Sequence, residues 1–368
     1  MNPELTPMDV AGRAERLQVA MATAEVPALL VTNLTNIRYL TGFTGSAALL
    51  VVTADRLTFV TDGRYGQQAA DQLGAAGVEA AIEVSSAKQK EAVAGAVASA
   101  GVGAVGLEAD AVTWAAQRTY AEHWFPGLEL VPTTGLVTGL RLVKDQGEID
   151  RLTAAAAIAD AALAEVRPRL ADGPTEIEFG LELDATMRRL GADDVSFETI
   201  VASGPNGAMP HHRPGHRTVI DGDLVVIDFG ALVDGYHSDM TRTVAVGDLS
   251  ATQQRMYDVV LASQAAGVQA VTAGIEAKAV DQACRAVIAE AGWADAFLHG
   301  TGHGVGLDIH EDPRVGQTST ATLVDRCVVT VEPGVYLPEH GGVRIEDTVV
   351  VTPDGCSPIT LTPKLAAV

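Results

Sequence analysis

Two stretches of the chain, ADGPTEIEFGLELDATMRRLGA (171–192) and TAGIEAKAVDQACRAVIAEAGW (272–293), share one pattern. In each, a turn with a glycine precedes an amphipathic helix pattern, and the helix pattern ends at a second glycine, a common helix C-terminus. Gly173 and Gly274 lie 101 positions apart, and so do Gly191 and Gly292. We therefore expect this part of the chain to consist of two pseudo-symmetric halves.

The similarity continues on both sides of these helices. Each is preceded by another helix pattern, at 149–163 and 254–268. Downstream, the strand pattern VVIDFG (225–230) matches VTVEPG (329–334), and SDMTRTVAV (238–246) resembles IEDTVVV (345–351). Four matches in the same order predict an α+β fold in which two helices of each half cover a piece of antiparallel sheet.

The aligned strands carry four acidic residues. Asp228 aligns with Glu332, and Asp239 aligns with Glu346. One such carboxylate at the end of an apolar strand would suit a salt bridge or a cap, because a buried charge needs a partner. Four of them in symmetric positions are better neutralised by metal ions. Four carboxylates and one histidine would suit two metals bridged by carboxylates and water.

The stretch HGTGHGVGLDIHE (299–311) supplies His299, His303 and His310. Its four glycines each weaken a helix interior by roughly 1 kcal/mol relative to alanine, which favours irregular backbone or strand over a helical zinc motif. We expect one of these histidines to bind metal and the others, with His211, to contact substrate or orient ligands. Oxygen-rich ligation with one imidazole favours Mn²⁺, with Co²⁺ and Zn²⁺ as alternatives.

The first 140 residues alternate helix and strand patterns and predict a smaller α/β domain. A charged helix start follows at Arg141 to Asp145, so we place the domains at 1–140 and 145–368. Eight of the nine histidines lie beyond residue 200, which places the chemistry in the second domain.

Composition restricts the partners and the location. The formal net charge of −22 argues against binding to nucleic acid or to an anionic membrane. The N-terminus has no signal-peptide pattern, and the longest apolar runs have the length of strands. Three scattered cysteines suit a reducing compartment. We expect a cytoplasmic protein.

The motifs also resemble those of a known family. Residues 196–212, 227–243, 299–311, 331–336 and 342–347 are similar to the pita-bread metallopeptidases, above all to the proline-specific branch of prolidase and aminopeptidase P. VTNLTNIRYLTGF (31–43) and TDGRY (61–65) resemble the creatinase-type N-terminal domain of that branch. The resemblance implies a pita-bread catalytic domain behind a smaller creatinase-type α/β domain, and a homodimer.

The resemblance also implies roles for individual residues. The implied metal ligands are Asp228, Asp239, His303, Glu332 and Glu346. His211 and His310 match histidines around the scissile carbonyl, and Glu332 matches a proton shuttle. Arg344 matches an arginine that holds carboxylates, including that of the substrate. His299 and His212 are candidates for substrate binding, whereas His216, His237 and His340 fit surface or packing positions.

The implied reaction is hydrolysis of the peptide bond before proline, by water that two divalent ions activate. An Xaa-Pro dipeptidase and an Xaa-Pro aminopeptidase for longer peptides both fit the motifs, and we favour the dipeptidase. A metal-free creatinase-type hydrolase or binding protein is disfavoured because all five ligands are present. A methionine aminopeptidase would not need the N-terminal domain.

Overall fold

The computed structural model describes residues 5–364 and 367, which form two compact units. One unit comprises residues 8–141, and the other comprises residues 5–7 together with the described residues from 142 onward. In the described part of the chain, no helix combines the length and the apolar character needed to cross a membrane.

The smaller unit is built on a mixed sheet of six strands in the order β4-β3-β2-β1-β5-β6. The strands are β1 (Ala28–Val31), β2 (Ala48–Thr53), β3 (Leu57–Thr61), β4 (Ala81–Val84), β5 (Ala104–Glu108) and β6 (Glu129–Thr133). The helices are α1 (Arg13–Thr23), α2 (Leu34–Thr41), α3 (Gly66–Ala75), α4 (Gln89–Ser99), α5 (Trp114–Thr119), a short π-helix (Tyr120–Trp124) and α6 (Thr138–Arg141). Helices between strands confirm the predicted α/β class.

The larger unit contains the predicted pairs of helices. They are α7 (Gln146–Val166), α8 (Glu176–Arg189), α9 (Ala251–Ala270) and α10 (Ala277–Glu290). Helices α8 and α10 begin and end 101 positions apart, as the glycine spacing predicts. Gly191 and Gly292 follow them with φ of 112° and 83°, a conformation that favours glycine and ends the helix.

The strands of the larger unit form small antiparallel sheets. The first half has β7 (Asp194–Val195), β8 (Ile200–Ser203), β9 (Leu224–Phe229), β10 (Ala231–Val233), β11 (Tyr236–His237) and β12 (Met240–Ala245). The second half has β13 (Gly302–Gly304), β14 (Glu311–Val315), β15 (Val328–Val331), β16 (Gly334–Leu337), β17 (Gly341–Arg344), β18 (Asp347–Thr352) and β19 (Gly355–Pro358). The central pairs correspond, because β9 pairs with β12 in one half and β15 pairs with β18 in the other.

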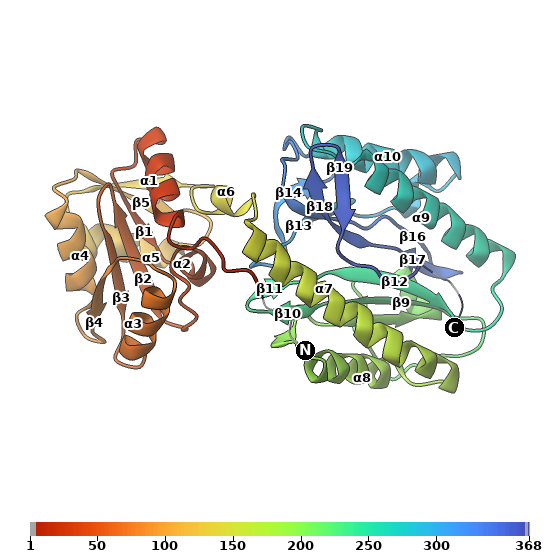
Figure 1. Cartoon of the computed structure of the whole chain (residues 1–368). Coiled ribbons are helices and arrows are strands. Elements are labelled where there is room, and N and C mark those ends of the chain that lie inside the picture. The colour runs from red at the N-terminus through yellow and green to blue at the C-terminus, as the bar shows by residue number, and fades with distance from the viewer. Residues whose placement is uncertain (1–4, 365–366, 368) are drawn as a thin grey trace. The chain divides into compact units, whose positions relative to one another are not determined.

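Each half packs its two helices on its own strands, which gives two apolar cores, and the core of the second half also includes one end of β9 and one end of β12. Phe179 and Leu183 of α8 pack with Ile227 of β9 in one core, and Val280 of α10 packs with Val329 of β15 in the other. Within the larger unit, the strands lie between the pair α7 and α8 and the pair α9 and α10 (Figure 1). This is the pseudo-twofold α+β arrangement predicted from the repeat, with two helices covering the sheet of each half.

The two halves meet along β12 and the start of β18. The backbone N–H of Glu346 donates to the carbonyl of Thr241 (3.1 Å), and Thr348 Oγ1 donates to the carbonyl of Asp239 (2.7 Å). A buried ion pair joins the Arg242 guanidinium to Asp347 (2.9 Å). These contacts bring the acidic residues of both halves to one place.

Candidate metal centre

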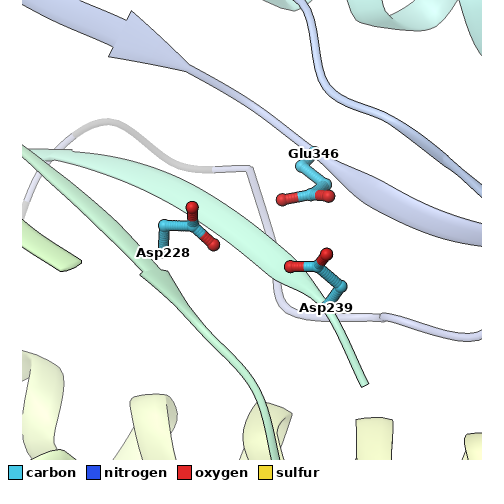
Figure 2. Close-up of side chains that lie close together, drawn as sticks. All are labelled: Asp228, Asp239 and Glu346. Carbon is cyan, nitrogen blue, oxygen red and sulfur yellow. The ribbon is translucent and has the colours of Figure 1, made fainter. Parts of the chain in front are cut away.

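Three of the predicted carboxylates converge at the meeting of the two halves. Asp228 lies near the end of β9, Asp239 directly precedes β12, and Glu346 directly precedes β18. Their side chains point toward one another (Figure 2), and one oxygen of each lies within 4.8 Å of one oxygen of the others. The first two belong to one half and the third to the other.

His303 and Glu332 lie beside this group. Nε2 of His303 is 3.5 Å from Asp239 Oδ2 and 3.5 Å from Glu332 Oε1. Nδ1 of His303 is 3.0 Å from the Gly304 carbonyl, which accepts a hydrogen bond from a protonated Nδ1. That bond leaves the lone pair of Nε2 directed at the carboxylates, as a metal-ligating histidine requires. The structure thus brings all five predicted ligands together.

The cluster of Asp228, Asp239 and Glu346 contains buried oxygen atoms that accept no hydrogen bond from the protein. Among the described residues, Asp228 Oδ1 and Glu346 Oε1 are buried without a hydrogen-bond partner. Burial and the charges of Glu346 and Asp228 raise the pKa of Asp239 well above its usual value, and burial with the charges of Glu332 and Asp228 does the same for the pKa of Glu346. Oxygen donors that crowd in this way, with one imidazole, fit divalent cations.

Glu332 differs from the other carboxylates in its surroundings. Burial raises its pKa to about 8, although the Arg344 charge acts in the opposite direction. Its side chain remains 17% exposed, so it lies where the group meets the cavity. A carboxylate in this position is suited to exchange a proton with a bound substrate.

Arg344 is buried and its donors are engaged by the protein. Its guanidinium donates to Asp228 Oδ2 (2.7 Å), to Tyr336 Oη (2.9 Å) and to the Pro210 carbonyl (3.3 Å), and its Nε donates to Thr241 Oγ1 (3.0 Å). This arrangement orients Asp228, and it leaves little of the guanidinium for a substrate carboxylate.

A cavity of about 970 Å³ opens over this cluster of carboxylates. It is lined by all five predicted ligands and by His211, His299, His310 and Arg344. Burial lowers the pKa of His310 and lowers that of His299 to about 4, so both rings are neutral near pH 7 and offer one donor and one acceptor. His299 Nε2 also lies 2.8 Å from the hydroxyl of Tyr336.

His212 is not among the residues that line the cavity. His212 belongs to the loop that carries His211, and its Nε2 lies 2.9 Å from Glu176 Oε2. The sequence pattern of two adjacent histidines gave no indication of this partner, because Glu176 is 36 residues away at the start of α8.

Two further residues of the site were not predicted. Tyr336 connects His299 to Arg344, and its place in the VEPGVY motif was the available signal. Arg314 on β14 lines the cavity, and its charge lowers the pKa of His303, His310 and Glu332, although burial is the largest influence on each. Arg314 follows His310 by four positions, but nothing in the sequence pattern alone indicates where its side chain lies.

Comparisons with known proteins agree with this geometry. The sequence profile of metallopeptidase family M24 matches residues 150–353, and that of the creatinase/prolidase N-terminal domain matches residues 13–143. An uncharacterised peptidase of Bacillus subtilis (strain 168) is 42% identical over 352 residues, which cover 96% of this chain and 98% of that protein.

Two solved structures superpose on nearly the whole chain. An Xaa-Pro dipeptidase from Bacillus anthracis has a TM-score of 0.93 and 39% identity, covering 98% of this chain and 100% of that chain. An X-Pro aminopeptidase from Thermotoga maritima has a TM-score of 0.87 and 31% identity, covering 95% of this chain and 100% of that chain.

Proposed function

The chain belongs to metallopeptidase family M24, and from that premise we propose that it is an Xaa-Pro dipeptidase that uses two divalent ions, Mn²⁺ in the cell. The observation that supports this proposal is the convergence of five ligands and three histidines on one cavity. The aminopeptidase alternative, with longer Xaa-Pro peptides as substrates, uses the same centre.

The residues that would hold the ions are Asp228, Asp239, His303, Glu332 and Glu346, and the family resemblance implies that Asp239 and Glu346 would be shared between the two ions. Asp239 Oδ2 lies 3.5 Å from Nε2 of His303, and one oxygen of Asp239 lies within 4.8 Å of an oxygen of Asp228 and of Glu346. When bound, divalent cations supply Lewis-acid activation of water and of the substrate carbonyl.

The remaining steps are assigned to side chains around the cavity. His211 and His310 hydrogen-bond the carbonyl oxygen of the residue before proline and stabilise the negative charge that develops there. Glu332 takes a proton from the attacking water as the new carbon–oxygen bond forms. It then delivers that proton to the prolyl nitrogen, so the carbon–nitrogen bond breaks and proline leaves as a secondary amine.

Metal removal and restoration test the dependence on divalent ions, and a comparison of two peptides tests the preference for dipeptides. We expect chelation to abolish cleavage of Ala-Pro and Mn²⁺ to restore it, with Co²⁺ and Zn²⁺ restoring less. Ala-Pro should be cut far faster than Ala-Pro-Ala, as measured by release of alanine. Equal or faster cleavage of the tripeptide would establish the aminopeptidase alternative, and no cleavage of either at any metal loading would refute both.

Arg314 is the proposed partner of the free prolyl carboxylate. It is exposed at the cavity wall, whereas the Arg344 donors are occupied by Asp228, Tyr336 and Pro210. Because a hydrogen bond to a charged group contributes about 1.5–3 kcal/mol, we expect Arg314→Met to lower kcat/KM for Ala-Pro by roughly 10–100-fold.

The same variant should cleave Ala-Pro amide, which has no carboxylate, nearly as well as the wild type does. Arg213→Met is the matched control, because Arg213 also lines the cavity but already forms an ion pair with Glu198. It should cause a much smaller change for Ala-Pro. An equal loss with both substrates in Arg314→Met would contradict the assignment.

We further propose a cytoplasmic homodimer, which follows from the family resemblance and from the cysteine content rather than from a contact seen in one chain. Sedimentation velocity of the purified protein measures the dimer directly, and a monomer at micromolar concentration would contradict it.

A further inference from the structure

The loop between β8 and β9 carries His211 into the cavity, and one buried carboxylate holds it on both sides of that residue. Glu176 Oε1 accepts hydrogen bonds from the backbone N–H of Ser203 (2.8 Å), from Ser203 Oγ (2.7 Å) and from Asn206 Nδ2 (2.9 Å). Glu176 Oε2 lies 2.9 Å from His212 Nε2 and accepts from the backbone N–H of Gly215 (3.1 Å). The two ends of the loop are thus tied to one side chain.

Glu176 is the first residue of α8 and is fully buried. Burial alone would raise the pKa of its carboxyl, but the hydrogen bonds from Ser203, Asn206 and His212 outweigh it and keep the pKa below its usual value. A carboxylate without solvent access needs such partners, so the loop and the charge stabilise each other.

The second half of the unit has a corresponding arrangement on α10. Asp281 is fully buried, and its Oδ1 accepts from the backbone N–H (3.1 Å) and from Oγ1 (2.9 Å) of Thr301. Its Oδ2 accepts from Arg285 Nε (2.7 Å), and Arg285 donates to the carbonyls of Phe297 and His299. Thr301 lies between His299 and His303.

The two arrangements have one type of contact in common. In each, a carboxylate on the second helix of the half binds both the N–H and the hydroxyl of one residue at the base of a histidine-bearing segment. Yet neither carboxylate lines the cavity, so neither contacts substrate. Glu176 is the first residue of α8 and Asp281 is the fifth residue of α10, so the two carboxylates are not at equivalent positions, yet each holds a segment that carries histidines of the cavity.

We infer that Glu176 and Asp281 are positioning residues of the two halves: Glu176 fixes His211 against the substrate carbonyl, and Asp281 fixes His299 and the ligand His303. The roles of these histidines rest on the proposed function. The segment held by Glu176 contains none of the proposed metal ligands, whereas the segment held by Asp281 contains one. The two carboxylates should therefore differ in their effect on metal binding.

The first test is Glu176→Gln, which keeps the size of the side chain but replaces one acceptor oxygen by a donor. At least one of the five donors from the loop would then face an amide N–H. We expect kcat for Ala-Pro to fall by roughly 10–100-fold, the loss typical of residues that orient a site from outside it. The Kd for Mn²⁺, measured by calorimetric titration, should stay within twofold of the wild type.

Glu182→Gln is the matched control, since Glu182 lies on the same helix but is exposed and pairs only with Arg169 among the described residues. It should leave both kcat and the Kd unchanged. Hydrogen exchange of residues 204–216 should become faster in Glu176→Gln and not in the control.

The second test is Asp281→Asn, which leaves one oxygen for either Thr301 or Arg285. We expect it to weaken Mn²⁺ binding by roughly 10–100-fold in addition to lowering kcat, because the backbone next to His303 is released. If both variants change the Kd equally, or if Glu176→Gln changes only the melting temperature and leaves kcat intact, the inference is overturned.

Two His212 variants keep the test decisive should Glu176→Gln fail to fold. His212→Gln retains a donor to Glu176 and should keep kcat within a few fold, whereas His212→Leu should reproduce the loss. If instead both His212 variants raise KM and leave kcat unchanged, His212 contacts substrate and the inference about Glu176 fails. Metal titration and hydrogen exchange need no turnover, so they remain informative even if the wild type does not cleave Ala-Pro, which would refute the proposed function alone.

Discussion

Asp239→Asn is expected to lower the rate of Ala-Pro hydrolysis by more than ~100-fold. Loss of a residue that only orients a ligand costs up to about 100-fold, and loss of a ligand itself should cost more. Asp239 lies 3.5 Å from His303 and forms one cluster with Asp228 and Glu346, so its loss removes a ligand that would contact both ions. The same change should make the metal-free protein more stable at pH 8, because an amide carries no charge that its buried neighbours oppose. The measurements are steady-state kinetics with Mn²⁺ and thermal unfolding with a chelator.

The sign of the stability effect follows from proton linkage. The folded pKa of Asp239 lies well above the unfolded value of 3.8, and that of Glu332 is about 8 against 4.5. The folded protein therefore binds protons that the unfolded chain has released. Stability from these groups is fully present below pH 4 and falls as the pH rises toward 8.

Comparing melting temperatures at pH 5 and pH 8 isolates this effect. The metal-free wild type should lose more stability over that interval than Asp239→Asn does. Asp258→Asn, on the exposed side of α9, is the control and should follow the wild type. A mutant that keeps its activity, or that melts in parallel with the wild type at both pH values, would contradict the assignment of Asp239 to the centre.

Arg344→Lys is expected to reduce kcat for Ala-Pro by roughly 10–100-fold although it keeps the positive charge. The guanidinium connects Asp228, Tyr336, Thr241 and the Pro210 carbonyl through separate N–H groups, and a single ammonium cannot reach all four. Because Pro210 directly precedes His211, the change should displace a histidine as well as a ligand. Kinetics with saturating Mn²⁺ measure the loss.

Arg344→Met should be worse, since it leaves Asp228 without its cation. Removing one partner of a buried ion pair costs about 3–5 kcal/mol, so the metal-free variant should also melt at a lower temperature. Arg188→Lys, at an exposed arginine of α8, controls for the substitution itself. Wild-type kcat in Arg344→Lys would show that charge alone is required at this position.

The periodic part of the fold could be predicted closely from the sequence. The 101-residue spacing predicted equivalent ends for α8 and α10, and the aligned strand patterns predicted that β9 corresponds to β15 and β12 to β18. Helices with glycine ends and buried strands depend mostly on local pattern. The carboxylates could be grouped because each lies within such a strand or directly beside one of its ends.

Contacts between distant segments could not be predicted in the same way. The partners Glu176 and His212 are 36 residues apart, and Arg344 and Asp228 are 116 residues apart. No periodic pattern in the sequence links the members of either pair, because which distant segments meet depends on how the chain folds. In the smaller unit, β4 and α4 lacked a clear pattern, since β4 is mostly exposed and α4 is rich in alanine. The role of each ligand stays a prediction until metal is titrated into variants.

The division of the centre between two halves has a consequence for the lifetime of the protein. Neither half carries enough ligands to retain the ions alone, so metal binds the joined halves in preference to the unfolded chain. A free ion concentration 100-fold above the Kd would then raise the free energy of unfolding by about 2.7 kcal/mol. A cell short of metal would hold the less stable form, which proteases degrade more readily, and the abundance of this protein would follow the metal supply.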